Sequence, residues 1–184
     1  MFWQSRSSID DKQTFLLDDK GELTFSEFFK IADDAFGAQA RGVVAIICGK
    51  NRETVIGYAG ALRAGHVPLL LDPTATADSL HKLIARYDAE YVFSHADLVP
   101  SGYAVFGGVG TYVLAQKNFP FAKDDMHPGL AALIPTSGST GDPKTVRLSH
   151  KNLASVTTYI ADYLGLDNQR RAVSLLPLQY SYGL

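Results

Sequence analysis

The chain has 184 residues and a formal net charge of −2, from 17 Lys+Arg against 19 Asp+Glu. This near balance removes the electrostatic case for a nucleic-acid binder or a protein held on an anionic membrane. The single cysteine, Cys48, excludes an intrachain disulfide and a cluster of thiolate metal ligands, and we expect it to be buried within the apolar run 43–48.

The first predicted elements are a hairpin and an amphipathic helix. Residues 15–17 and 22–24 flank an Asp/Gly turn, which predicts a β-hairpin. Thr24 and Glu27 match a capping box at the start of a helix. Apolar residues follow at helical spacing and indicate a buried face: Phe25, Phe28, Phe29, Ala32, Ala35 and Phe36.

The middle of the chain alternates apolar strands with amphipathic helices. Strands are predicted at 43–48, 67–71 and 91–93, with a helix capped by Asn51 between the first two and another helix before the third. Such alternation predicts right-handed βαβ units and a parallel sheet flanked by helices on both faces. The expected fold class is therefore α/β.

After residue 94 the pattern weakens. Two short strands are expected at 103–106 and 111–114, and the loop at 115–129 is a candidate internal boundary. Three histidines lie at the ends of predicted elements, where we expect surface positions rather than catalytic ones: His66, His81 and His95.

Between two predicted strands lies the segment 135–144, with the sequence PTSGSTGDPK. Gly138 and Gly141 allow positive φ, so that successive backbone N–H groups can turn toward an anion. Lys144 adds a positive charge, and four hydroxyl groups add donors without negative charge: Thr136, Ser137, Ser139 and Thr140. A polyphosphate is the ligand that this set of donors fits best.

Two other interpretations compete with a polyphosphate site. A flexible Ser/Gly surface turn would explain any one pair of these residues, but the combination of hydroxyls, glycines and a Pro-Lys pair between apolar strands disfavours it. A Walker-type P-loop needs its lysine directly after a glycine and at the start of a helix. Here Asp142 and Pro143 separate Gly141 from Lys144, and a strand follows, which excludes that motif. The helix comes later, with Ser149 as its predicted N-cap.

Residues 136–144, followed by Ser-His-Lys-Asn at 149–152, resemble the phosphate-loop signature of the adenylate-forming enzymes. That superfamily comprises acyl-CoA synthetases, nonribosomal peptide adenylation domains and luciferase-like ligases. Residues 61–73, which end in Asp-Pro, resemble the helix–strand segment of the family, and residues 176–184 resemble its Pro-Leu-Phe-His-Ser-Tyr-Gly-Leu motif.

The resemblance implies an ATP- and Mg²⁺-dependent ligase, which joins a carboxylic acid to the α-phosphate and passes the acyl group to CoA or another acceptor. It implies that Tyr180 borders the acyl substrate. Pro135 and Thr145 depart from the family pattern, which usually has an aromatic residue and a glycine there, and this puts the mobility of the loop in question. The residues implied in holding the ATP phosphates are Thr136, Ser137, Gly138, Ser139, Thr140, Gly141 and Lys144.

Complete enzymes of this family are several times longer than this chain. We expect residues 1–184 to be the N-terminal part of the large AMP-binding domain, without the rest of that domain or the C-terminal domain that carries a catalytic lysine. No residue here is assigned a catalytic role, and we expect the chain alone to be inactive. The alternatives are a nucleotide-binding or split-enzyme module without independent catalysis, and a structural subdomain with an empty loop.

Three further expectations concern the surroundings of the protein. Hydrophobic surface left by the missing part predicts self-association. No segment reaches the roughly 18 apolar residues needed to cross a bilayer, and residues 1–8 lack the apolar core of a signal peptide, so a cytoplasmic location is expected. The carboxylic acid and the acyl acceptor stay open.

Overall fold

The computed structural model of this chain describes residues 11–119, 126–136, 144–167, 170–174, 176–180. It begins with an antiparallel hairpin of β1 (Thr14–Asp18) and β2 (Gly21–Thr24), as the Asp/Gly turn predicts. Helix α1 (Phe25–Phe36) follows directly, and its capping box is formed. The Thr24 hydroxyl accepts from the Glu27 N–H, and the Glu27 carboxylate accepts from the Thr24 N–H at 2.8 Å.

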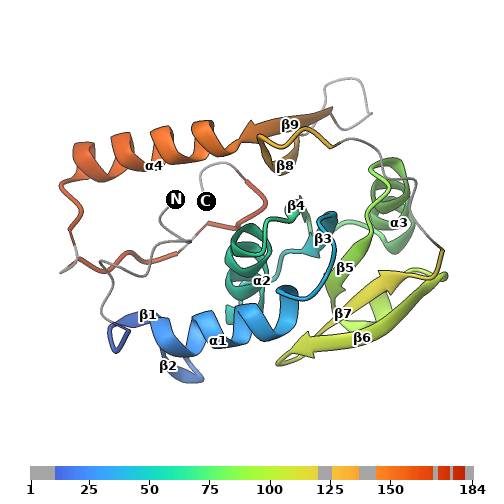
Figure 1. The fold of residues 1–184 in the computed structure, drawn as a ribbon, viewed down its shortest axis with the longest axis horizontal. Helices are drawn as coiled ribbons and strands as arrows, with labels where there is room; N and C mark the ends of the chain where they lie inside the picture. Colours follow the sequence, from blue (N-terminus) through green and yellow to red (C-terminus); the bar gives the residue numbers. More distant parts are fainter. Residues whose placement is uncertain (1–10, 120–125, 137–143, 168–169, 175, 181–184) are drawn as a thin grey trace.

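A seven-stranded mixed sheet lies at the centre of the molecule (Figure 1). In the strand order β6-β7-β5-β3-β4-β8-β9, the bounds are β3 Val43–Ile47, β4 Val67–Leu71, β5 Tyr91–Ser94, β6 Tyr103–Val109, β7 Tyr112–Lys117, β8 Leu130–Thr136 and β9 Lys144–Ser149. Strands β5, β3, β4 and β8 are parallel, whereas the pairs β6–β7, β7–β5 and β8–β9 are antiparallel. The predicted α/β class with helix-flanked parallel strands is confirmed, and the antiparallel strands extend the sheet at both edges.

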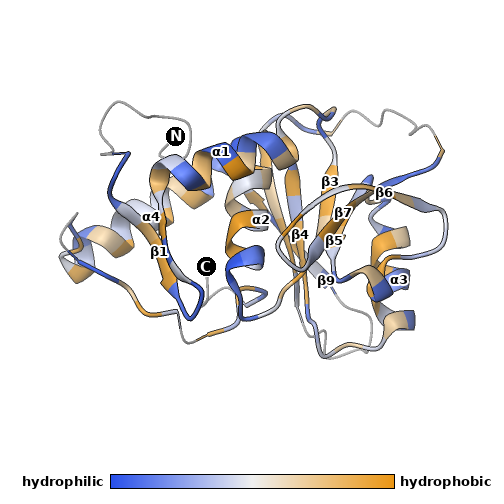
Figure 2. Cartoon of the chain, turned by 90° about the horizontal axis from the view of Figure 1, so that it is seen from below, coloured by the Kyte–Doolittle hydropathy of each residue, from blue (hydrophilic) through white to orange (hydrophobic). Residues whose placement is uncertain are grey.

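Helices cover both faces of the parallel strands. Helices α1 and α2 (Arg52–Arg63) lie on one face, where the buried side chains include Phe36, Val44, Ile46, Ala61, Leu70 and Phe93. Helix α3 (Ala77–Arg86) lies on the other, where they include Val43, Ala45, Ile47, Val67, Leu69, Leu71, Leu80 and Ile84. Successive side chains of a strand point to opposite faces, and β3 and β4 read as unbroken apolar runs because both faces are buried. Figure 2 shows this hydrophobic centre on β3 and β4.

Two ion pairs fasten the N-terminal hairpin to the first turn of α2. Arg52 pairs with Asp18 and donates to the carbonyl oxygen of Gly21 at 2.7 Å. Its neighbour Glu53 is 1% exposed and accepts from the ammonium group of Lys20 at 2.6 Å. A buried carboxylate needs such a partner, so the hairpin is held in one place on α2.

Helix α2 starts at its predicted cap and approaches β5 closely. The side-chain oxygen of Asn51 accepts from the Thr54 N–H at 2.9 Å. Further along, Gly57 lies directly over Phe93, and a Cβ atom added at this glycine would lie 2.6 Å from the ring. The absence of a side chain at Gly57 therefore sets the distance between helix and sheet.

Helix α4 (His150–Leu164) lies to one side of these layers (Figure 1). It begins at the predicted cap Ser149 and ends at Gly165, which has a φ of 59°. None of its residues is buried, and its exposed large apolar side chains are Val156, Tyr159, Ile160, Tyr163 and Leu164. In the described part of the chain, no helix combines the length and apolar content needed to cross a membrane.

The segment between β5 and β8 contains both strands expected there. The short 3₁₀ helix η1 (Ala96–Leu98) leads into the β6–β7 hairpin. The internal boundary proposed within residues 115–129 stays a prediction, because β7 continues to Lys117 and residues 120–125 lie outside the described residues.

Candidate functional site

The predicted motifs meet at the carboxyl edge of the parallel strands. Strands β4 and β8 are parallel neighbours, with Leu69 opposite Leu133. Asp72 follows the last residue of β4, and Thr136 is the last residue of β8, so both lie at the carboxyl ends of neighbouring parallel strands. Ligands of open α/β sheets bind outside the carboxyl ends of the strands, so this edge is where a site is expected.

The two ends of the predicted phosphate loop are held together as a β-ladder. Thr136 and Lys144 are register partners on β8 and β9, and the Thr136 hydroxyl donates to the carbonyl oxygen of Lys144 at 3.0 Å. Both residues are exposed, which leaves the lysine ammonium on the surface at the base of the loop. The predicted strand–loop–strand arrangement is therefore confirmed at its base. The loop residues predicted to bind phosphate lie outside the described residues: Ser137, Gly138, Ser139, Thr140 and Gly141.

Thr145 explains one departure from the family pattern. Its side-chain hydroxyl donates to the hydroxyl of Tyr87, the residue that ends α3. A glycine at this position could not make that bond. Thr145 therefore ties the strand that leaves the loop to the helix layer beneath it, a contact across 58 residues that sequence periodicity does not reveal.

Tyr180 reaches the same edge from the C-terminal segment. Its hydroxyl donates to Oδ2 of Asp72 at 3.3 Å, while Oδ1 of Asp72 accepts from the N–H and the hydroxyl of Thr74 at 2.8 and 2.7 Å. Partial burial acts to raise the pKa of Asp72, but the hydrogen bonds from Thr74 and Tyr180 outweigh it and hold that pKa below its usual value. Asp72 is thus an ionised carboxylate that links β4 to the Tyr180 segment, a role that the sequence did not reveal.

Of the three histidines expected at the surface, His66 contradicts the expectation. It is 1% exposed, its Nδ1 accepts from the Gly42 N–H at 3.2 Å, and its Nε2 lies 3.1 Å from the carbonyl oxygen of Phe36. The end of α1, the start of β3 and the start of β4 converge here and enclose the ring. Burial, helped by the positive charge of Arg41, lowers the pKa of His66 despite the opposing hydrogen bonds to Phe36 and Gly42, so the ring is neutral and structural. His95 is exposed, as expected.

Cys48 is buried, as the sequence predicts. The side chain is 2% exposed at the end of β3. Burial raises the pKa of its thiol to about 12, so the nucleophilic thiolate is scarcely populated at neutral pH. Among the residues that the structure describes, no group of three or more His, Cys, Asp or Glu side chains is arranged to hold a metal ion.

We compared the chain with known protein families and proteins. The family described as AMP-binding enzyme matches residues 10–184. Tyrocidine synthase 2 of Brevibacillus parabrevis is 32% identical over 135 residues, which cover 71% of this chain and 4% of that protein. Surfactin synthase subunit 3 of Bacillus subtilis (strain 168) is 27% identical over 146 residues, which cover 76% of this chain and 11% of that protein.

Solved structures share the fold. The o-succinylbenzoate CoA synthetase MenE of Bacillus subtilis, in complex with AMP, has a TM-score of 0.77 at 18% identity and is matched over 100% of this chain and 51% of that one. ATP-bound MatB of Rhodopseudomonas palustris has a TM-score of 0.72 at 24% identity, over 95% of this chain and 39% of that one. This chain spans about half or less of the length of each of these relatives. Because the family match extends over residues 10–184, the chain belongs to the AMP-binding, adenylate-forming enzyme family.

Proposed function

We propose that this chain carries the ATP phosphate-binding part of a ligase that activates a carboxylic acid as its acyl-adenylate. The observation that carries the proposal is the ladder between Thr136 and Lys144, which closes the predicted phosphate loop at the carboxyl edge of the sheet. Membership of the AMP-binding family and the ATP-bound and AMP-bound states of two structural relatives support it.

The residues present at this edge fit a polyphosphate. The Lys144 side chain is exposed where β9 leaves the loop, and it supplies positive charge without a described ion pair. Hydroxyl and backbone N–H donors from Ser137, Ser139 and Thr140 complete the proposed cradle for the β- and γ-phosphates. Bound Mg-ATP would supply an electrophilic α-phosphorus, to which a carboxylate oxygen bonds as the bond to pyrophosphate breaks.

The contribution of this chain to that step is positioning and charge neutralisation, which dominate phosphoryl transfer. Lys144 and the loop donors hold the leaving pyrophosphate, while Tyr180 borders the carboxylic acid. Asp72 fixes the Tyr180 hydroxyl and so sets where that border lies. The relatives include peptide synthetases and a CoA synthetase, which leaves CoA, another thiol and an amine as proposed acyl acceptors.

A second candidate is a nucleotide-binding or split-enzyme module without catalysis of its own. The share of each relative that the chain covers favours it, because 39 to 51% of the solved chains is matched. We propose that residues 1–184 form the N-terminal part of the large AMP-binding domain, with an internal boundary within 115–129. The residues that complete the active site would then lie outside it.

Calorimetric titration of the 184-residue chain with Mg-ATP tests the phosphate site. Replacement of Lys144 by alanine should weaken binding about tenfold, the value of one charge-assisted contact. Arg147→Ala is the matched control, because Arg147 is an exposed cation on the same strand. Absence of binding, or an equal loss in both variants, contradicts the proposed site.

ATP–pyrophosphate exchange separates the two candidates. The chain alone should give no exchange above background with fatty, aryl or amino acids. Exchange by the chain alone would establish an independent ligase and refute the proposal of a module without its own catalysis. Binding without exchange, together with exchange restored by adding the remainder of a relative's large domain, supports the split module.

A further inference from the structure

Strand β6 is an unprotected edge of the sheet. It is the outermost strand on its side, and within the described residues it pairs only with β7 (Figure 1). Its seven residues, YAVFGGV, include no charged side chain, and Val105 and Phe106 are 55% and 45% exposed. The opposite edge strand, β9, carries Lys144 and Arg147. Charged side chains protect sheet edges from added strands, so of the two edges of the seven-stranded sheet the β6 edge is the one whose described residues lack this protection.

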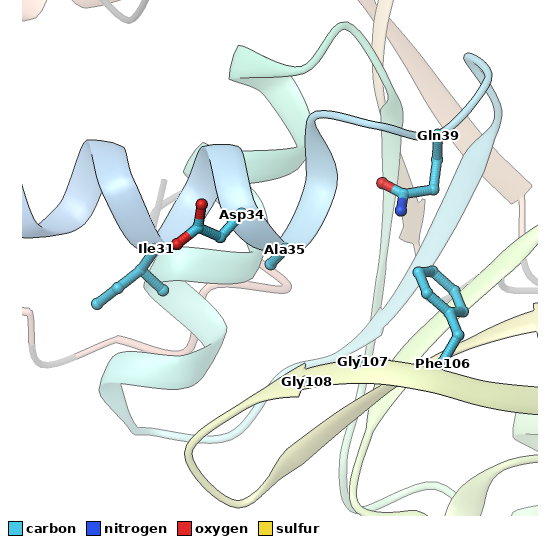
Figure 3. A pocket seen from close by; sticks show the side chains of 7 residues that line it. All are labelled: Ile31, Asp34, Ala35, Gln39, Phe106, Gly107 and Gly108. Carbon is cyan, nitrogen blue, oxygen red and sulfur yellow. The ribbon is translucent and has the colours of Figure 1, made fainter.

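A pocket of about 420 Å³ adjoins this edge (Figure 3). Helix α1 contributes Ile31, Asp34 and Ala35, the segment after α1 contributes Gln39, and β6 contributes Phe106 and its two glycines. A Cβ atom added at Gly107 would meet no atom within 4 Å, so the glycine leaves the pocket open where a side chain could stand. The pocket is large enough for one long side chain of a bound segment.

The groups that line the pocket favour a cation. The side-chain oxygen Oε1 of Gln39 is buried and has no hydrogen-bond partner among the described residues, so it is an acceptor that awaits a donor. Asp34 adds a carboxylate, whose only described ion pair is an exposed one with Lys30 on the same helix. The ring of Phe106, set edge-on to Tyr91 with the centroids 6.4 Å apart, adds an aromatic surface that attracts cations. No lysine or arginine lines the pocket.

We propose that the β6 edge and this pocket form a docking site for an extended protein segment that carries a lysine or arginine. The segment adds a strand to β6 through backbone hydrogen bonds, and its basic side chain enters the pocket toward Asp34 and Gln39. Strand addition supplies affinity and the side-chain pocket supplies specificity. This site lies on α1 and β6, away from the phosphate loop between β8 and β9, and does not depend on the function proposed above.

Defined peptides test both parts of the site. The probe is a fluorescein-labelled peptide of seven residues, which is the length of β6. The peptide alternates threonine and valine around a central lysine. One control peptide has glutamate in place of the lysine, and another keeps the lysine but has alternate amide nitrogens methylated. In fluorescence anisotropy the lysine peptide should bind at least about tenfold more tightly than either control.

Two variants locate the binding. Gly107→Val adds a branched side chain at a residue that lines the pocket, and its Cβ atom would meet no atom within 4 Å, so the variant should retain the melting temperature of the parent and lose peptide binding. Asp34→Asn should weaken the lysine peptide about tenfold and leave the glutamate peptide unchanged or improved. Its matched control is Asp78→Asn, which breaks a similar exposed i,i+4 pair with Lys82 on α3 and should change nothing.

Several outcomes overturn the proposal. Equal binding of the lysine and glutamate peptides, or no binding up to about 1 mM, refutes the cation pocket. Equal binding of the methylated peptide refutes strand addition. A dimer in light scattering that Val105→Lys dissociates would assign the edge to a second copy of the chain instead. If Gly107→Val does not fold, the Asp34→Asn and Asp78→Asn comparison decides alone.

Discussion

Protonation of His66 should destabilise the folded chain. The ring is buried, Nδ1 accepts from the Gly42 N–H, and Nε2 lies within hydrogen-bonding distance of the carbonyl oxygen of Phe36. A protonated ring has no acceptor nitrogen, so the buried Gly42 N–H would lose its partner. The pKa of His66 is lowered below the ordinary 6.5, so the unfolded chain binds this proton more readily than the folded one.

The sign and the size of the effect follow from linkage. Because the folded pKa is depressed, the stabilising contribution is fully present above pH 6.5 and is lost as the pH falls from there to the folded pKa. The free energy of unfolding should fall in this window by at most about 1.4 kcal/mol per pH unit from this group. Direct removal of the ring, in His66→Ala, should cost about 3 kcal/mol, from the cavity and the unpaired Gly42 N–H.

Urea unfolding between pH 7.5 and pH 5, followed by circular dichroism, measures this slope. His66→Gln keeps one acceptor and one donor but does not titrate, so its stability should fall less steeply than that of the parent. Equal slopes for the parent and His66→Gln would refute the assignment of His66 as a neutral, structural ring.

Three further predictions address α2 and the end of β3. Gly57→Ala should cost about 1–3 kcal/mol, measured by thermal unfolding, because its methyl group would overlap the buried ring of Phe93; an unchanged melting temperature would contradict the packing. Asn51→Ala should cost about 1 kcal/mol by removing the acceptor for the Thr54 N–H, whereas Asn51→Ser should restore most of it. Cys48, with a pKa of about 12, should react with Ellman's reagent only after unfolding, and rapid labelling at neutral pH would contradict its burial.

Local structure was predictable from the sequence because the signals are local. The caps Thr24, Asn51 and Ser149 act on backbone groups within three residues, and each is formed as expected. The apolar runs of β3 and β4 likewise predict buried parallel strands, since only a strand covered on both faces lacks polar alternation. Strand order is different, because it depends on which runs pair across the sheet, and the antiparallel direction of the edge strands leaves no mark in local periodicity.

The error at His66 has the same physical origin. A polar residue between a helix-ending glycine and a strand is normally at the surface, and Gly65 with its φ of 83° is such a turn. The end of α1 and the chain leading into β3 cover this turn, and they supply Gly42 and Phe36 as partners for the ring. Contacts between residues 24 and 30 positions apart decide its burial, and no pattern within one element contains them.

The proposed phosphate site would depend on a separation of charges at the carboxyl edge of the sheet. Asp72 is ionised and directly follows β4, the parallel neighbour of β8, and an unmatched carboxylate at this edge would oppose a polyphosphate. Both of its oxygens are already engaged, one by Thr74 and the other by Tyr180, so the charge is used to join β4 to the C-terminal segment. On the other side of Thr136, Lys144 is exposed and supplies the opposite charge. The ionised carboxylate that orients Tyr180 thus lies on the β4 side of β8 and the exposed Lys144 on the β9 side, and in the proposed function the polyphosphate would bind on the Lys144 side.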